Sequence, residues 1–467
     1  MSGNTTIVIG LQYGDEGKAR FVDQLANEND IVARFNGGAN AGHTVVANGK
    51  KFALRQVPAG VLHPEKKLYI GSGCVVNIVK LFQEIGSLEQ VNIEVSSRLK
   101  IAARAGVIQP HHILMDKILS GSVGTTGNGI GPAYADRCIR SWQGRTVAIN
   151  IAMLVNETET SLQIMRDQLT EFGSLFNVEI ESYAPEISKI EQHITSLKPL
   201  VEANPLYMTN QAKKGDKILF EGAQAVMLDV CQGTTPFVTS SQTIAAAAYT
   251  GGDLPPNFHG KTIGIAKAIM SRVGFGPFVS EFGGQESEKY CMSFTEEGKP
   301  KFDRDYENKL PLEELLKSND EFELSKAIRN FSGEYGTVTG RPRRIGALDL
   351  VQLKYAIQTN GVDEFILTKC DLLSLFSKTA SGKIPLITAY EIDGKQVTSM
   401  PATATELRKA KPITTYFDGF TEDISEIRNS EAIPHNLKLL LSSIEDFVEC
   451  KLAGIGVGPD REQFVSF

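Results

Sequence analysis

The feature that most constrains the fold is the β-branched run at residues 5–9, TTIVI, which ends at Gly10 and leads into a glycine-containing loop. A short run of this kind predicts a buried strand, and residues 17–25 predict a helix after the loop. Further short apolar strands are predicted, with longer helical stretches between them, at residues 31–33, 67–70, 217–220, 262–266 and 364–367. This alternation predicts an α/β fold with a mostly parallel central sheet flanked by helices.

The 467 residues are enough to bury a large core, and 42% hydrophobic with 22% charged residues is ordinary for a folded, water-soluble protein. We expect residues 1–467 to form one elaborated domain. Residues 155–200 carry charged residues and apolar residues at helical spacing, which predicts peripheral helices. Residues 283–330 are polar and charged, and we expect them to be an insertion whose function stays open.

The net charge of −7 argues against a general nucleic-acid or anionic-membrane surface and favours a small-molecule partner. No stretch approaches the length needed to span a bilayer, and residues 1–18 lack the pattern of an export signal. The six cysteines form no CxxC pair and no zinc-type cluster with histidine; they are Cys74, Cys138, Cys231, Cys291, Cys370 and Cys450. We therefore expect a cytoplasmic protein with reduced thiols.

The loop at residues 10–18, GLQYGDEGK, has the composition of a phosphate site. Its glycines let backbone N–H groups approach an anion, and Lys18 adds a positive charge. It is not a Walker A loop, because Gln12 stands where the first glycine belongs and Ala19 replaces the serine or threonine that binds Mg²⁺. Asp15 must therefore have another role. The alternative is a glycine turn with charged surface residues.

A second small-residue loop, residues 35–45 (FNGGANAGHTV), carries His43 between glycine and threonine. A histidine in such a loop is accessible and can titrate near neutral pH. A single histidine is more often structural, so His43 gains functional weight only from the motifs around it.

The segment Lys369-Cys370-Asp371 follows the strand predicted at residues 364–367. A carboxylate accepts hydrogen bonds from guanine N1–H and the 2-amino group, which adenine cannot offer, while the lysine stem packs on the base. This loop therefore predicts GTP binding in preference to ATP.

A dense cationic loop, GRPRR, contains Arg341, Arg343 and Arg344. Guanidinium groups recognise carboxylates and phosphates through paired hydrogen bonds, so the loop suits an anionic substrate. The alternative is a solvated run of charge.

The two N-terminal loops, QYGDEGK and NGGANAGHTVV, together resemble the signature opening of the adenylosuccinate synthetase family. Further segments resemble the family in the same order: GTTGNGIGPAYADR (124–137), FEGAQAVMLD (220–229), TPFVTSSQT (235–243), RVGFGPF (272–278), TGRPRRIGALD (339–349), LTKCD (367–371) and VGPDREQ (457–463). The resemblance spans the chain, and several long motifs in one order are far more specific than a lone glycine motif. It implies the fold of that family, with a P-loop-like GTP site.

The resemblance implies a two-step ligase reaction of purine biosynthesis. The γ-phosphoryl group of GTP moves to the 6-oxygen of IMP, and L-aspartate then displaces that phosphate to give adenylosuccinate. Asp15 would be the general base at N1 of IMP, His43 would stabilise the 6-oxygen, and Lys18 would neutralise the transferred group. Mg²⁺ would be held by Asp15 and the Gly42 carbonyl.

The resemblance also implies the binding residues. For IMP these are Asn40, Thr126, Gln224, Thr239 and Arg140, with Arg140 contributed by the second subunit of a homodimer. The aspartate carboxylates would face Thr339 and Arg341. The GTP site would contain Gly14, Gly17, Thr44, Arg343, Lys369, Asp371, Gly458 and Pro459.

The chain departs from the family pattern at several positions. Asn128 stands where the family has an arginine, and Val338 where it commonly has a threonine. Smaller departures are Ala19-Arg20, Cys231-Gln232 and Gly456. Two alternatives therefore stay open: a paralogue that joins a different amino acid or 6-oxopurine nucleotide by the same chemistry, and a regulatory GTP-binding protein.

Overall fold

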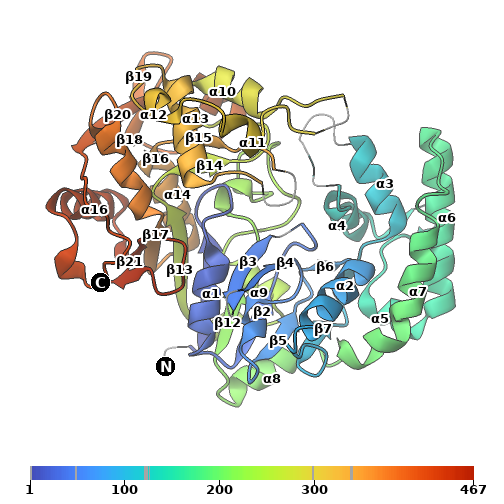
Figure 1. Cartoon of the computed structure of the whole chain (residues 1–467). Coiled ribbons are helices and arrows are strands. Elements are labelled where there is room, and N and C mark those ends of the chain that lie inside the picture. Colours follow the sequence, from blue (N-terminus) through green and yellow to red (C-terminus); the bar gives the residue numbers. More distant parts are fainter. Residues whose placement is uncertain are drawn as a thin grey trace.

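The computed structural model describes residues 3–40, 42–47, 50–119, 125, 127–142, 144–296, 299–336 and 340–467, with the backbone alone for residues 43–47, 50, 51 and 119. Its centre is a ten-stranded sheet (Figure 1). In spatial order the strands are β11 (Val201–Glu202), β7 (Leu99–Ala102), β5 (Lys67–Ile70), β2 (Ile31–Arg34), β12 (Ile218–Glu221), β1 (Thr5–Gly10), β13 (His259–Lys267), β17 (Glu364–Thr368), β21 (Lys451–Gly456) and β22 (Phe464–Ser466).

Neighbouring strands pair in parallel from β11 through β21, and β22 pairs antiparallel with β21. The register places Ile7 of β1 beside Phe220 on one side and Thr262 on the other. The central residues of these strands are mostly apolar because helices cover both faces of a parallel sheet. The predicted α/β fold is therefore confirmed, and all six predicted strands are present.

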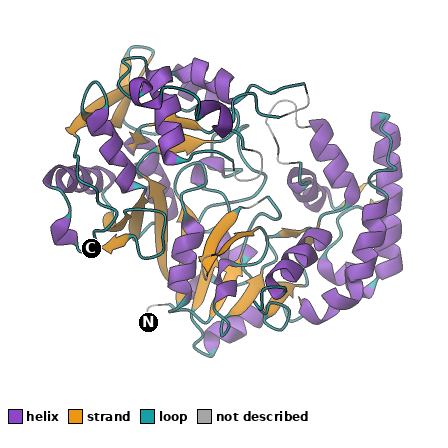
Figure 2. Cartoon of the chain, viewed as in Figure 1, coloured by secondary structure: helices purple, strands orange, loops and turns teal. Residues whose placement is uncertain are grey.

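Helices surround the strands of the central sheet (Figure 2). Helix α1 (Lys18–Ala26) follows β1 and contacts β1 and β12, while α14 (Leu350–Asn360) contacts β13 and α16 (His435–Val448). In α16 the buried residues recur every three or four positions; they are Leu437, Leu440, Leu441, Ile444 and Val448. This spacing explains why these segments become helices that face the sheet.

Helices gather at the right of Figure 1, on the side of the sheet where β7 lies. They are α2 (Ile78–Glu89), α3 (Pro110–Leu119), α5 (Ile151–Asn156), α6 (Thr158–Phe176) and α7 (Pro185–Leu197). Helix α6 packs on α3, and α7 packs on α2. These contacts join residues 155–200 to α2 and α3.

Residues 283–330 form a group of short helices, α10 (Gly284–Cys291), α11 (Arg304–Glu307), α12 (Leu312–Leu315) and α13 (Glu321–Ser332). Two oppositely charged side chains of this polar segment are fully buried, Glu307 and Arg329, and they form an ion pair of 2.8 Å. The Arg329 guanidinium also donates to the Arg343 carbonyl at 3.0 Å, which joins the segment to the arginine loop, while its origin as an insertion stays a prediction.

Two of the smaller sheets outside the central one are formed by the second half of the chain. An antiparallel pair, β14 (Met270–Arg272) with β15 (Arg344–Gly346), places Arg272 beside Arg344. Another sheet contains β16 (Leu348–Asp349), β18 (Lys383–Ile392), β19 (Lys395–Val397) and β20 (Lys411–Asp418). Because β14 begins shortly after β13 ends, the β14–β15 pair brings the arginine loop to the end of the central strands.

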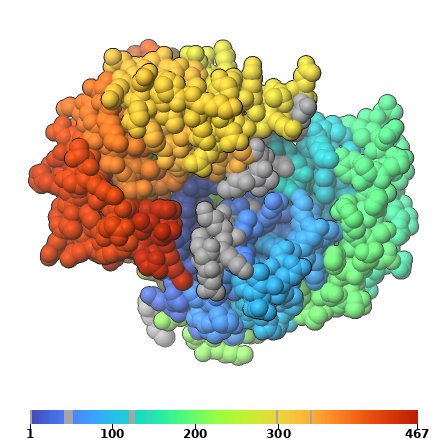
Figure 3. Space-filling model, in the orientation of Figure 1, coloured from blue at the N-terminus to red at the C-terminus, as the bar shows by residue number. Residues whose placement is uncertain are grey.

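In the space-filling view, residues from about the middle of the chain onward, yellow to red, form the upper and left part, and the blue to green residues form the rest (Figure 3). The predicted phosphate loop belongs to the blue part, whereas the arginine and guanine loops belong to the other. The helices of the described residues include none that is both long enough and apolar enough to cross a membrane.

Candidate active site

The loop between β1 and α1 is wrapped around the side chain of Glu16. Gly14, Asp15 and Gly17 have φ angles of 94°, 60° and 87°, a left-handed conformation that favours glycine. The buried carboxylate of Glu16 accepts a hydrogen bond of 2.7 Å from the Gly14 N–H and pairs with the Lys18 ammonium at 2.7 Å. Lys18 is therefore held inside the loop, close to the backbone N–H groups expected to face phosphate.

The side chain of Gln12 has a structural role that the glycine of a Walker A loop could not fill. The side-chain amide of Gln12 makes two hydrogen bonds with the backbone of Lys267 at the end of β13. Gln12 Nε2 donates to the Lys267 carbonyl at 3.0 Å, and the Lys267 N–H donates to Gln12 Oε1 at 2.9 Å. A glycine could make neither bond. Gln12 therefore attaches the loop to the neighbouring strand through its side chain.

Asp15 and Arg343 meet at the outer end of this loop. The Asp15 carboxylate is 40% exposed, and the Arg343 guanidinium lies 2.9 Å from it. The same guanidinium lies 2.6 Å from the buried carboxylate of Glu334. Burial raises the pKa of Glu334, but Lys267, Lys369 and Arg343 lower it further, to well below its usual range. Glu334 is thus a buried anion among cations.

The guanine loop carries a buried carboxylate oxygen that has no hydrogen-bond partner within the described protein. This atom is Oδ1 of Asp371, and burial raises the pKa of the Asp371 carboxyl. An unpartnered buried acceptor is costly unless a ligand supplies the donors. Arg20 holds the segment that contains Gly458 near Asp371. Its guanidinium donates to the carbonyls of Gly458 at 2.6 Å and Gln463 at 2.7 Å.

Asn40 and Gln224 converge above Gly37. A Cβ atom at Gly37 would lie 3.2 Å from Gln224 Oε1 and 3.6 Å from Asn40 Oδ1, so both amides border the same small space. Gln224 has a φ of 57°, and its Oε1 is buried without a hydrogen-bond partner in the described part of the chain. Two amide groups in this arrangement suit a ligand that both donates and accepts hydrogen bonds.

Comparison with known proteins decides the family. A family model described as adenylosuccinate synthetase matches residues 7–465. A relative from Cupriavidus pinatubonensis, adenylosuccinate synthetase 2, is 42% identical over 470 residues, covering 100% of this chain and 98% of its own length. One from Arthrobacter, adenylosuccinate synthetase, is 36% identical over 464 residues, covering 98% and 97%. The chain belongs to the adenylosuccinate synthetase family.

Solved structures agree with membership of this family. The fully ligated adenylosuccinate synthetase of Plasmodium falciparum has a TM-score of 0.84 and 29% identity, with 100% of both chains covered. The succinoaminodeoxyadenylate synthetase of cyanophage S-2L has a TM-score of 0.57 and 16% identity, covering 100% of this chain and 96% of that one, and shows the shared fold alone. The predicted ligase of purine biosynthesis, acting on IMP and aspartate with GTP, is confirmed, and neither alternative is favoured.

Some of the site residues predicted from the family resemblance are described only in part, or not at all. Thr126 and Thr339, together with the departing Val338, lie outside the described residues. His43 and Thr44 begin β3 (His43–Ala47), which pairs with β4 (Lys50–Leu54), and only their backbone is described. Gly42, directly before them, is exposed.

Other predicted residues have definite surroundings. Arg140 is exposed at the end of α4 (Ile130–Ile139), with a φ of 66°. Thr239 is half-buried, and its N–H donates to the Leu228 carbonyl at 2.8 Å. The Arg341 guanidinium contacts Met292 Sδ and lies 4.9 Å from the ring centre of Phe294. Gly17 and Pro459 are exposed.

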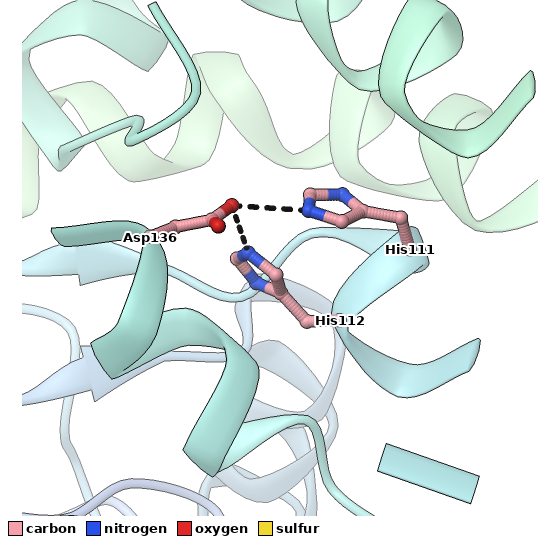
Figure 4. Close-up of side chains that lie close together, drawn as sticks. All are labelled: His111, His112 and Asp136. Atoms are coloured by element: carbon pink, nitrogen blue, oxygen red, sulfur yellow. Dashed lines mark hydrogen bonds and ion pairs between the residues drawn. The ribbon is translucent and has the colours of Figure 1, made fainter. Parts of the chain in front are cut away.

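A buried cluster that sequence analysis missed, His111, His112 and Asp136, joins α3 to α4 (Figure 4). Both histidines contact the same oxygen of Asp136 through Nε2, at 3.1 and 2.9 Å. His112 Nδ1 accepts a hydrogen bond from the Gln109 N–H at 3.0 Å, so its single proton is on Nε2. That nitrogen donates to Asp136 and cannot bind a metal at the same time.

Glu16, Lys267 and Glu334 are the charged side chains around the site that sequence analysis also missed. Glu16 lies within the recognised motif, but the motif does not show that its carboxylate turns inward. Lys267 and Glu334 carry no motif of their own that the sequence analysis could use. Their role depends on the meeting of β13, the arginine loop and the guanine loop.

Proposed function

We propose that this chain joins L-aspartate to IMP through a 6-phosphoryl-IMP intermediate, with the residue roles that follow. The Asp15 carboxylate takes the N1 proton of IMP, and the 6-oxygen then attacks the γ-phosphorus of GTP as GDP leaves. The amino group of aspartate next attacks C6 and displaces phosphate. The observation that carries the proposal is the exposed Asp15 carboxylate on the phosphate loop, next to Lys18 and Arg343.

The transferred phosphoryl group needs neutralising charge more than covalent help. Lys18 and Arg343 are the cations placed for this role, and His43 would stabilise the 6-oxygen. Mg²⁺ fits the donor set, because it prefers oxygen ligands and the exposed Asp15 carboxylate and the Gly42 carbonyl offer them. When bound, the ion would neutralise charge on the phosphates of GTP.

Guanine recognition rests on Asp371. Its unpartnered buried Oδ1 is suited to accept the N–H donors of guanine, while the Lys369 stem packs on the base. Gly458 and Pro459 would border the base, held there by the bonds from Arg20 to the carbonyls of Gly458 and Gln463. Gly14, Gly17 and Thr44 would lie along the phosphates.

IMP would lie with its base between Asn40 and Gln224, whose amides border one space. Thr126 and Thr239 would hold the 5′-phosphate, together with Arg140 from the partner subunit of a homodimer. Arg140 is exposed, and next to it Ile139 and Trp142 expose 44% and 56% of their surface, which suits a subunit interface. The protein would act in the cytoplasm.

The proposal that L-aspartate is the amino-acid substrate rests on Thr339, Arg341 and a cation near position 128. The family has an arginine at that position, whereas this chain has Asn128. The Lys80 ammonium of α2 donates a hydrogen bond to Asn128 Oδ1, so a positive charge remains beside this position. Lys80 therefore offers the charge that an aspartate carboxylate requires.

The deciding experiment supplies Mg-GTP, IMP and one amino acid at a time, and follows phosphate release and the ultraviolet band of a 6-substituted purine. We expect turnover with L-aspartate that depends on IMP. Phosphate release that does not need IMP would rule out the ligase reaction, and turnover with another amino acid would correct the substrate. Lys80→Met should raise KM for aspartate, while Lys354→Met, a surface lysine paired with Glu449, should leave it unchanged.

The homodimer proposal is tested by mixing two inactive variants, Asp15→Asn and Arg140→Leu. If Arg140 acts in the partner's site, each mixed dimer contains one intact site, and random mixing restores about a quarter of the wild-type sites. If the mixture stays inactive although the subunits exchange, Arg140 does not act across the interface.

A further inference from the structure

A continuous chain of charged side chains links the guanine loop to the phosphate loop. It runs from Lys369, after β17, to Glu334, after α13, then to Arg343, before β15, and ends at Asp15. The four residues come from four separate segments of the sequence. Glu334 is the member that touches both the guanine side and the Asp15 side.

The two oxygens of Glu334 have different partners. Oε1 contacts the ammonium of Lys369 and lies 3.4 Å from that of Lys267. Oε2 lies 2.6 Å from the Arg343 guanidinium and accepts a hydrogen bond of 2.9 Å from Ser271 Oγ. Lys369 and Arg343 are thus held by opposite ends of one carboxylate, and a turn of that carboxylate alters both contacts.

Burial makes this arrangement sensitive to small changes. The side chain of Glu334 is 1% exposed and that of Lys267 is fully buried, so water cannot replace a lost partner. Burial lowers the pKa of Lys267, and the charge of Glu334 opposes that shift. Removing the charge of Glu334 would leave three cations close together in a poorly solvated place, and they would repel one another.

We propose that Glu334 is a positioning residue that couples guanine binding at Lys369 and Asp371 to the placement of Asp15 beside IMP. The reason is geometric, because Lys369 cannot keep its ammonium on Glu334 and its stem on a base without setting the orientation of that carboxylate. Glu334 in turn holds Arg343, and Arg343 holds Asp15. Guanine binding therefore favours one position of Asp15, and IMP binding favours the same arrangement by reciprocity.

The inference rests on the proposed roles of Lys369, Asp371 and Asp15, and its test requires no turnover. The affinity of the full-length protein for GDP is measured with Mg²⁺, with and without saturating IMP, by titration calorimetry. We expect IMP to tighten GDP binding about 5- to 100-fold in the wild type, the usual range of coupling between sites. In Glu334→Gln this ratio should fall close to one, while IMP alone still binds.

The matched control is Glu281→Gln. Glu281 is also a buried carboxylate, paired with Arg344 of the same arginine loop at 2.9 and 3.0 Å through the guanidinium Nε, but no ion pair of the described residues joins it to Lys369 or Asp15. This variant should keep the wild-type ratio. An equal loss in both variants would mean that any buried charge in this region supports the site, and would overturn the inference.

A second variant covers the case in which Glu334→Gln does not fold. Lys369→Met removes the guanine end of the chain and leaves Glu334 with Lys267, Ser271 and Arg343. The affinity of this variant for GDP should be the same with and without saturating IMP, even if that affinity is weaker than in the wild type and the titration needs more GDP. An unchanged ratio in either variant, or the absence of coupling in the wild type, would overturn the inference, whereas absent turnover in the wild type would count against the proposed function instead.

Discussion

The guanidinium of Arg343 lies 2.9 Å from the carboxylate of Asp15, and thereby joins the arginine loop to the phosphate loop at the opposite end of the sequence. Asp15 has a left-handed backbone conformation, and its side chain is 40% exposed where Arg343 contacts it. The pair places the proposed general base next to a positive charge. This setting suits a reaction in which negative charge gathers on phosphoryl oxygens.

Asp15→Asn should abolish most of the turnover while leaving GDP binding largely intact. An amide cannot take the N1 proton, and loss of a general base commonly costs about 10²- to 10⁴-fold in rate. Guanine recognition depends on Asp371, which is a separate residue on another loop. Phosphate release and GDP titration measure the two effects, and lost GDP binding would make Asp15 mainly a metal ligand.

Asp371→Asn should weaken GTP binding by about 100-fold or more. Each hydrogen bond to a charged group is worth about 1.5–3 kcal/mol, and the amide replaces one acceptor oxygen by a donor. We expect KM for GTP to rise while the preference for guanine over hypoxanthine in the nucleotide declines. Asp418→Asn, an exposed change, is the control. Unchanged selectivity between GTP and ITP would contradict the assignment.

The stability of the protein should fall in mild acid because of His112. Burial, together with the neighbouring His111, lowers the pKa of His112 from 6.5 to about 4. Unfolded His112 takes up a proton near pH 6.5, whereas the folded form does so only near pH 4, so the free energy of unfolding falls as pH decreases between these values. The loss reaches about 3 kcal/mol at most.

Urea denaturation between pH 4.5 and 6.5 measures this effect. The range excludes Asp136, whose pKa is raised by burial but lowered by both histidines to about 2, so that its contribution is lost only below pH 3.8. His112→Gln keeps a donor toward Asp136 and should show a shallower decline with falling pH. His435→Gln, at an exposed position, should follow the wild type. Equal slopes in all three proteins would show that His112 does not carry the effect.

Glu307→Gln should destabilise the protein strongly, although it lies in the polar segment 283–330. Its carboxylate and the Arg329 guanidinium are fully buried, so the change leaves a buried charge without its counterion. Such a loss costs about 3–5 kcal/mol. Glu186→Gln breaks an exposed pair with Lys189 and should cost below about 1 kcal/mol. Similar melting temperatures for both variants would show that this segment contributes little to stability.

The sequence alone determined six of the ten strands of the central sheet and the order of the functional loops. The apolar runs that became β1, β2, β5, β12, β13 and β17 are local signals, because a strand covered on both faces must be apolar throughout. The loop motifs are also local and long enough to indicate the family. Four strands of the central sheet, β7, β11, β21 and β22, and the outer sheet of β16, β18, β19 and β20 were not predicted, because their patterns are brief or mixed.

The tertiary structure decided which charged residues meet. Pairing of β14 with β15 brings Arg343 and Arg344 to the end of β13, and only then do Lys267 and Glu334 become neighbours of the site. Gln12, a departure from a known motif in the sequence, becomes a side-chain bridge to Lys267. Local patterns reflect which residues avoid water, whereas the partner of a buried charge depends on contacts between distant segments, which no local pattern specifies.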